Sequence, residues 1–325
     1  MPTAPNIART KPPLLRSGDT VGIVAPASNV KPALLEAGCA ALRDLGYKPF
    51  YFDSIFERDL YFAGSAARRA RELEEMFVRD EIRAIVCARG GYGSNYLLDI
   101  LDLKKIKSHP KIFVGYSDLT SLLTYLADSA GLITFHGPMV AKDFAHADGV
   151  DLNSWQRALN GSSEWTLKLD ADVKALIEGS AEGILYGGCL SMLVASLGTP
   201  YEIRTAGTIL FIEDIAAKPY QIDRMLMQLK LAGKLAEVRG IIFGEMVDCV
   251  QNNKEQSYTL EEVVLRVVGG VGVPVAYGLR SGHVSRNNMT LPFGVRAALN
   301  VTSAGVDVEI LEAATVEAVA SRSAG

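Results

Sequence analysis

The chain has 325 residues, a length that suggests two domains. Hydrophobic residues make up 49% and charged residues 22%, a composition that is typical of soluble globular proteins and argues against disorder or fibrous repeats. The formal net charge is -4, so the chain lacks the broad positive field that binds a phosphate backbone, and we expect no nucleic-acid partner.

The cysteines and the amino-terminal residues indicate where the protein works. Cys39, Cys87, Cys189 and Cys249 lie too far apart in sequence for a zinc site or a redox pair, so we expect reduced thiols, no metal and no cofactor. The first twenty residues lack the apolar run of a signal peptide, which predicts a cytoplasmic protein without membrane association. Residues 183–201 are uncharged, but their glycines and Pro200 predict a buried helix with a flanking loop.

Short apolar strands alternate with amphipathic segments over the first 140 residues. We expect strands at 21–25, 49–53, 82–88 and 112–115, and helices at 32–45, 66–78 and up to 126. This alternation predicts a Rossmann-like parallel sheet, with the chemistry at the carboxyl ends of its strands. The helix at 66–78 is expected to expose five charged side chains, namely Arg68, Arg69, Arg71, Glu72 and Glu74.

The pattern changes after residue 140, where polar residues and glycines indicate a linker. We therefore predict an amino-terminal domain over 12–160 and a carboxy-terminal domain over 180–325. The second domain should contain strands at 208–212 and 240–243, a helix at 220–231 and a β-rich end at 274–311. The predicted fold class is α/β with a smaller, β-rich second domain.

Ser117 lies where the predicted strand 112–115 runs into a helix. A serine at such a junction stands clear of its neighbours, and the amide of Asp118 would point at an oxyanion formed on an attacked carbonyl. Serine is also among the best helix N-cap residues, and from the residues at this junction alone we favour capping over catalysis. Leu119 stands where the nucleophile-elbow motif has its second glycine, so the match to that motif is incomplete.

A nucleophilic serine needs a base, and the chain has four histidines. His283 follows Gly282 in a predicted loop, and we favour it slightly over His136, which could be a buried residue or a substrate contact. Glu213 closes the predicted strand 208–212, where a carboxylate could be rigid enough to orient the base, or could be an ordinary helix cap.

The segment 89–93 is rich in glycine and follows the predicted strand 82–88. Its amides could hold an anion, lend an oxyanion-hole donor beside Ser117, or form only a tight turn. The segment lacks both the spacing of a dinucleotide-binding motif and the Lys-Ser or Lys-Thr of a P-loop.

Eight short blocks, taken in order over residues 12–311, resemble the serine L,D-carboxypeptidase family. This family comprises the cytoplasmic muropeptide peptidases, which are grouped with the microcin-immunity peptidases. A single block would be weak, but the ordered set is specific. The blocks begin at Gly18, Arg89, Gly115, Phe135, Gly187, Phe211, Ile222 and Gly282.

The resemblance implies a role for each candidate residue. Ser117 would be the nucleophile, His283 the general base and Glu213 the residue that orients this base. The amide of Asp118 and one from Gly90 or Gly91 would form the oxyanion hole. Arg89 is a candidate partner for a substrate carboxylate, and His136 is a candidate substrate contact.

The resemblance also implies a substrate and an assembly. The family removes the terminal D-alanine from murein tetrapeptides in peptidoglycan recycling, and usually forms homodimers. Its microcin-immunity branch cleaves peptidyl or aminoacyl nucleotides and should add an aromatic residue that stacks on adenine. Between Ile215 and Tyr220 the only aromatic is Tyr220, which favours the muropeptide branch. A non-enzymatic module that binds a phosphate ligand at residues 90–93 is the alternative from another class.

Overall fold

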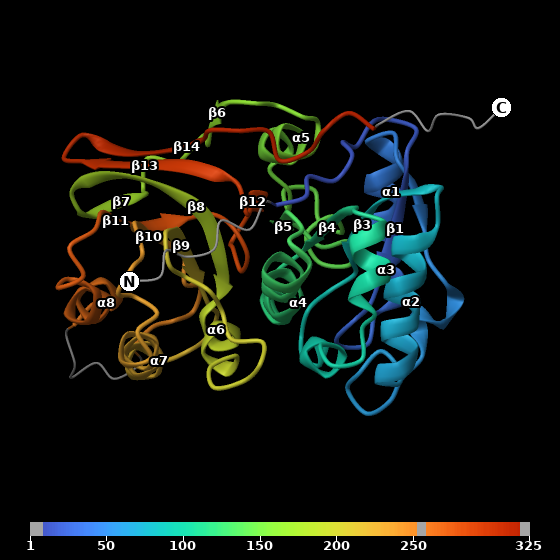
Figure 1. Cartoon of the computed structure of the whole chain (residues 1–325), viewed down its shortest axis with the longest axis horizontal. Coiled ribbons are helices and arrows are strands. Elements are labelled where there is room, and N and C mark those ends of the chain that lie inside the picture. Colours follow the sequence, from blue (N-terminus) through green and yellow to red (C-terminus); the bar gives the residue numbers. More distant parts are fainter. Residues whose placement is uncertain (1–8, 252–257, 319–325) are drawn as a thin grey trace.

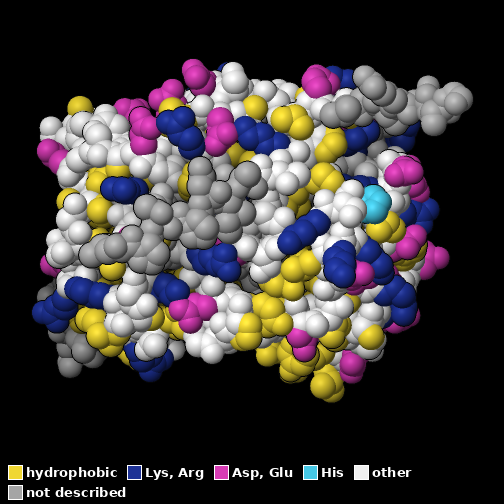
Figure 2. Space-filling model, in the orientation of Figure 1, with side chains coloured by type: hydrophobic (Ala, Val, Ile, Leu, Met, Phe, Trp, Pro, Cys, Tyr) yellow, Lys and Arg dark blue, Asp and Glu magenta, His cyan; other side chains and the backbone are white. Residues whose placement is uncertain are grey.

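A computed structural model describes residues 9–251 and 258–318 of the chain. Two sheets lie side by side, and helices pack against both (Figure 1). The α/β class with a Rossmann-like first sheet is confirmed. Lys, Arg, Asp and Glu side chains are interspersed over the face shown in Figure 2. Within the described ranges, no helix is long and apolar enough to cross a membrane.

The first sheet has six strands in the order β12-β5-β4-β3-β1-β2, and all neighbours are parallel except β12 and β5. The strands are short, and all except the edge strand β2 are almost wholly buried, as expected for a parallel sheet covered on both faces. Their bounds are β1 (Thr20–Val24), β2 (Lys48–Phe50), β3 (Ile82–Cys87), β4 (Ile112–Gly115), β5 (Thr134–His136) and β12 (Leu291–Phe293).

Alternate residues of β3 enter two different hydrophobic clusters. Ala84 and Val86 pack with α1 on one face, whereas Ile85 and Cys87 pack with α2 on the other. The helices of this half are α1 (Pro32–Asp44), α2 (Ala66–Val78), α3 (Leu103–Ser108), α4 (Thr120–Tyr125) and α5 (Leu152–Leu159). Short helical turns are η1 (Asp53–Phe56), η2 (Ser94–Leu97), η3 (Ser117–Leu119) and η4 (Leu126–Ala130).

The second sheet has eight strands in the order β6-β14-β13-β8-β9-β10-β11-β7. The four strands from β8 to β11 are parallel, and those outside them are antiparallel. The strands are β6 (Trp165–Thr166), β7 (Lys174–Ile177), β8 (Gly179–Cys189), β9 (Thr208–Glu213), β10 (Gly240–Gly244), β11 (Val275–Leu279), β13 (Arg296–Thr302) and β14 (Gly305–Ile310). Three helices lie along one side of this sheet in Figure 1, namely α6 (Leu190–Ala195), α7 (Pro219–Leu231) and α8 (Leu260–Val268).

Strand β12 joins the two halves of the molecule. It comes from the carboxy-terminal part of the chain, yet it pairs with β5, with Leu291 opposite His136 and Phe293 opposite Thr134. The largest hydrophobic cluster accordingly contains residues of both sheets, among them Val21 and Leu299. The loop between β11 and β12 is thereby held against the first sheet.

Two expectations are wrong in part. Residues 183–189 belong to strand β8, and only Leu190–Ala195 form the predicted helix. Residues 185–189 are uncharged because they are buried where β8 pairs with β9. Gly187 permits this pairing, because a Cβ there would lie 1.9 Å from the Phe211 carbonyl oxygen. Arg68 and Arg69 are buried rather than solvent-facing, since their guanidinium groups bind backbone carbonyls such as Gly64 O.

Candidate active site

A cleft of about 430 Å³ lies at the carboxyl ends of the first-sheet strands and contains the two favoured reactive residues. Ser117 and His283 both line it, together with Gly90 and Gly91. The Tyr116 ring, one residue before Ser117, meets the His283 imidazole edge to face with 5.2 Å between ring centres. The fold therefore brings a hydroxyl and an imidazole, which are distant in sequence, to one surface.

Ser117 occupies a left-handed backbone conformation with φ at 64°. Non-glycine residues adopt this region at a cost, and such strain marks sharp turns that present a side chain. No side-chain cap is formed at the start of η3 or of α4, so Ser117 does not cap a helix. The strand-to-turn-to-helix geometry is that of a nucleophile elbow, despite Leu119.

Gly90 faces Ser117 directly. A Cβ built on Gly90 would lie 2.9 Å from the Ser117 Cβ and 3.1 Å from its Oγ, distances too short for any larger residue without displacement. A glycine at position 90 is therefore what lets this loop backbone approach the serine.

The Asp118 carboxylate ties the glycine loop to the serine turn. One oxygen accepts from the Gly93 amide at 3.2 Å and the other from the Ser94 amide at 2.8 Å, while the Ser94 hydroxyl donates to the Asp118 carbonyl at 2.6 Å. Burial raises the pKa of Asp118, and these donors oppose the shift. The sequence indicated only the amide of Asp118, because nothing in the local pattern predicts this bond across the sheet edge.

Glu213 ends β9 and is completely buried behind His283. Its Oε2 accepts from the His283 backbone amide at 3.0 Å and lies 2.7 Å from the His283 Nδ1. Because a carboxylate only accepts, the proton of the neutral imidazole resides on Nδ1, which leaves Nε2 free to take a proton.

The two groups shift one another's protonation. Burial acts to raise the pKa of Glu213, but His283 and His136 outweigh it and lower that pKa to about 2. Burial acts to lower the pKa of His283, and Glu213 outweighs it, so that the pKa lies above its ordinary value. A strong base held by a charged carboxylate is what the deprotonation of a hydroxyl requires.

His136 lies behind this pair and does not line the cleft. Its ring is fully buried, with Nε2 3.8 Å from Glu213 Oε1 and Nδ1 2.9 Å from Ser281 Oγ. A direct substrate contact, one of the two expectations for this residue, does not fit this position. The expectation that it is a buried histidine does.

Positively charged side chains surround the cleft. Arg89 lines it, as expected for a carboxylate partner, and its guanidinium also donates to the Asn29 carbonyl at 3.3 Å. Lys31 and Lys142 line it as well. Nothing in the sequence marks these two lysines as cleft residues, because they lie in polar segments where lysine is common and carries no specific signal.

Cys189 joins Glu213 and His283 in a group whose candidate ligand atoms lie within 4.8 Å of one another. Burial raises the pKa of the Cys189 thiol well above its ordinary value, so the sulfur keeps its proton and is a poor metal ligand. We interpret the group as a hydrogen-bonded carboxylate and imidazole beside a buried thiol.

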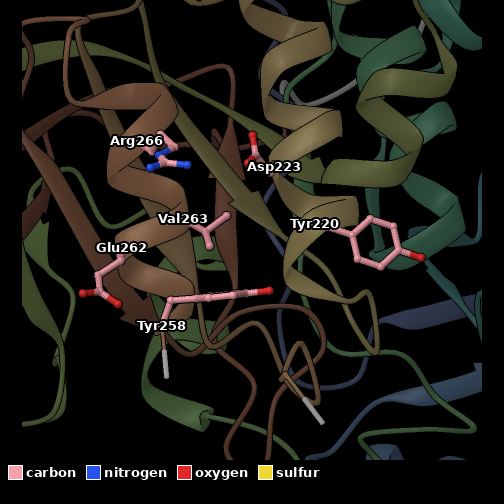
Figure 3. A pocket seen from close by; sticks show the side chains of 6 residues that line it. All are labelled: Tyr220, Asp223, Tyr258, Glu262, Val263 and Arg266. Atoms are coloured by element: carbon pink, nitrogen blue, oxygen red, sulfur yellow. The ribbon is translucent and has the colours of Figure 1, made fainter. Parts of the chain in front are cut away.

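A second pocket, of about 530 Å³, lies between α7 and α8 (Figure 3). Tyr220 and Asp223 reach it from α7, and Glu262 and Arg266 reach it from α8. None of its lining residues lines the Ser117 cleft. Tyr220 therefore does not line the Ser117 cleft, whereas Ile215 does.

A hydroxyl on a strained turn, beside an imidazole that a buried carboxylate holds, is typical of hydrolases that attack carbonyl groups. Comparison with known proteins gives the particular family. A model of the LD-carboxypeptidase N-terminal domain matches residues 21–137, and one of the C-terminal domain matches residues 182–299. The chain belongs to the LD-carboxypeptidase family and is a peptidase.

Individual relatives span nearly the whole chain. A probable murein peptide carboxypeptidase of Bacillus subtilis is 40% identical over 92% of this chain and 94% of its own length. The solved muramoyltetrapeptide carboxypeptidase of Oxalobacter formigenes covers 90% of this chain and 99% of its own, at 30% identity and a TM-score of 0.80. The microcin C7 self-immunity protein, solved with aspartyl sulfamoyl adenosine, covers 94% of this chain and 100% of its own, at 27% identity and a TM-score of 0.87.

Proposed function

We propose that this protein is a serine-type L,D-carboxypeptidase that removes the terminal D-alanine from murein tetrapeptides. Ser117 is the nucleophile, His283 the general base and Glu213 the residue that orients the base. The observation that carries the proposal is that Ser117 and His283 line one cleft while Glu213, buried behind them, holds the His283 ring. The muramoyltetrapeptide and murein peptide carboxypeptidases among its relatives support the substrate class.

The reaction follows from these groups. The Ser117 oxygen attacks the carbonyl carbon of the last peptide bond while His283 Nε2 takes the hydroxyl proton. The bond to nitrogen then breaks, the imidazolium returns the proton to the leaving amine, and D-alanine departs. Water attacks the resulting ester by the same route and restores the serine.

Backbone amides stabilise the charge that develops on the carbonyl oxygen. We assign this role to the amide of Asp118, next to the nucleophile, and to that of Gly90 or Gly91 on the facing loop. Loss of one such donor should cost about 2.7 to 4 kcal/mol of transition-state stabilisation.

The positively charged side chains that line the cleft can bind the carboxylates of an anionic peptide. A murein tetrapeptide carries a free carboxylate one residue beyond the bond to be cleaved, and Arg89 is our candidate for binding it. Lys31 and Lys142 line the same cleft and can pair with further carboxylates. The family resemblance supports a cytoplasmic homodimer that acts in peptidoglycan recycling.

The second candidate is cleavage of a peptidyl or aminoacyl nucleotide, since the microcin C7 self-immunity protein is also a relative. That activity needs an aromatic surface for the base. Tyr220 lines a different pocket, and the aromatic residue that lines the cleft, Tyr116, is buried with its ring packed against His283. Neither ring offers a free stacking surface in the cleft, which favours the peptide substrate.

The experiment is a direct assay of D-alanine release. The purified protein is incubated with a murein tetrapeptide, and D-alanine is followed by mass spectrometry. Ser117→Ala should lower the rate by about 1000-fold or more. Ser121→Ala, one helical turn further along, is the matched control and should stay active.

Three results would overturn parts of the proposal. Undiminished release by Ser117→Ala would remove Ser117 from the mechanism. Turnover of an aminoacyl nucleotide analogue, with no release from the tetrapeptide, would move the protein to the microcin-immunity branch. Binding of inorganic phosphate without hydrolysis of either substrate would favour a binding module.

A further inference from the structure

The proposed mechanism uses one oxygen of Glu213 and leaves the other unexplained. Oε2 accepts two hydrogen bonds from His283, whereas Oε1 is buried and has no hydrogen-bond partner within residues 9–251 and 258–318. A charged oxygen without a donor is costly in a protein interior. Its neighbour is the Nε2 of His136, at 3.8 Å, and this nitrogen is likewise buried and without a partner among the described residues.

Three residues fix the orientation of the His136 ring. Phe211 and Phe293 pack against it, with ring centres 5.1 and 5.3 Å away. Gly282 lies against both His136 and Glu213: a Cβ there would lie 2.6 Å from the Glu213 Cδ and 2.8 Å from the His136 Cε1. Glycine is thus required at 282 so that the ring can face the carboxylate.

The contact of His136 Nδ1 with Ser281 shows that this nitrogen carries a proton. The Ser281 hydroxyl donates to the Met289 carbonyl at 2.9 Å, and a carbonyl can only accept. Ser281 Oγ has therefore used its proton, and it must accept at the 2.9 Å contact with His136 Nδ1. Nδ1 consequently carries a hydrogen.

The state of Nε2 follows from the same reasoning. In a neutral ring with a proton on Nδ1, the lone pair of Nε2 would face a carboxylate oxygen, so that two buried acceptors would oppose each other. A proton on Nε2 converts this into an ionic contact, within about an ångström of hydrogen-bond distance. We propose that His136 is a positioning residue, and this proposal rests on the proposed function. His136 is an imidazolium whose Nε2–H faces Glu213 Oε1, and it holds this carboxylate in place for His283.

Several ionisable groups lie around His136. Glu213 is its counter-ion, and His283 lies on the other side of that carboxylate. Tyr116, whose ring centre is 6.0 Å away, donates its hydroxyl to Asp143 at 3.3 Å. Burial lowers the pKa of His136 below its ordinary value even though Glu213 opposes this shift. The charge that we assign to the ring therefore depends on the two acceptor oxygens that face its nitrogens, Ser281 Oγ and Glu213 Oε1.

The consequence for the reaction is that His283 is a weaker base than it would be beside Glu213 alone. Glu213 shares its negative charge between two rings, which lowers the basicity that it confers on His283. Removal of the charge on His136 should therefore raise the pKa of His283 and move the acidic limb of the pH–rate profile to higher pH. A residue that only filled space would lower the rate without moving this limb.

The first test reads the protonation state without substrate. In the full-length protein labelled with ¹⁵N-histidine, the His136 signals can be assigned by their contacts to the Phe211 and Phe293 rings. We expect both ring nitrogens to be protonated at pH 7, and one to lose its proton in Glu213→Gln. An unprotonated His136 nitrogen in the wild-type protein would overturn the proposal.

The second test measures D-alanine release by variants. His136→Phe removes the donor, and we expect kcat to fall about tenfold or more with little change in KM, as when a partner behind a functional histidine is lost. His136→Gln keeps a neutral donor and should recover part of the rate, with its acidic limb at higher pH than in the wild type. An unshifted limb in both variants would refute the charge on His136.

The control is His109→Gln, because His109 lies at the end of α3 and, among the described residues, its ring bonds the Lys105 carbonyl of the same helix. This variant should keep the wild-type rate and pH profile. Failure of the wild-type protein to release D-alanine would reject the proposed function, whereas the NMR result on His136 would still decide the present proposal.

Discussion

Gly90 and Ser117 belong to loops that follow neighbouring parallel strands, and the structure presses them together until a methyl group on Gly90 would lie 2.9 Å from the Ser117 Cβ. This contact couples the glycine loop to the proposed nucleophile. Gly90 does not adopt a left-handed backbone, so the requirement for glycine here is steric and not conformational.

Gly90→Ala should therefore reduce D-alanine release while leaving the fold intact. The added methyl group must push Ser117 or the loop aside, and a displacement of about 1 Å at a reacting group can cost on the order of 100-fold in rate. Gly270→Ala is the matched control, because a Cβ there meets nothing within 4 Å. Equal activity of the two variants would show that the close contact between Gly90 and Ser117 does not affect the reaction.

The strained backbone at Ser117 predicts that a glycine variant is more stable than an alanine variant there, which is the reverse of the order in a helix. Alanine keeps the left-handed strain at φ 64°, whereas glycine removes it, so Ser117→Gly should be more stable to urea than Ser117→Ala by about 1 kcal/mol. At Ser121, inside α4, the order should reverse, because glycine costs about 1 kcal/mol in a helix. The same order at both sites would mean that Ser117 is not strained in solution.

The Asp118 carboxylate should matter for stability and activity together. Asp118→Ala leaves the buried amides of Gly93 and Ser94 without their acceptor, which should cost about 2 to 3 kcal/mol of unfolding free energy and loosen the loop beside Ser117. Asp102→Ala removes a comparable pair of bonds at the exposed start of α3 and should cost about 1 kcal/mol. We expect only Asp118→Ala to lose activity, and full activity in that variant would argue against the coupling.

The pH dependence of the rate should report on the pair of His283 and Glu213. The base must be neutral to take a proton, so activity falls as the pH drops through the pKa of His283, which Glu213 holds above its ordinary value. In Glu213→Gln this support is lost, so the acidic limb should move to lower pH while kcat falls. A limb that stays in place would show that another group limits the rate at low pH.

The local pattern of the sequence was sufficient for most of the first sheet and for the position of Ser117. Strands such as 82–88 and 112–115 could be predicted because an apolar run that ends at glycine or serine has few alternatives in a parallel sheet. The junction after Gly115 likewise marked the serine, because a strand that passes directly into a helix must turn sharply there.

Contacts between segments that are distant in sequence determined the rest of the fold and of the candidate site. Glu213 ends β9 and His283 follows β11, so their hydrogen bond joins positions 70 residues apart, which no local period encodes. For His136 the sequence left burial and substrate contact open, and the burial of Arg69 was not predicted, because a polar residue that finds its partners in the interior has the same sequence signature as one on the surface. Composition and periodicity are local quantities, whereas the satisfaction of buried charges depends on which distant segments the chain brings together.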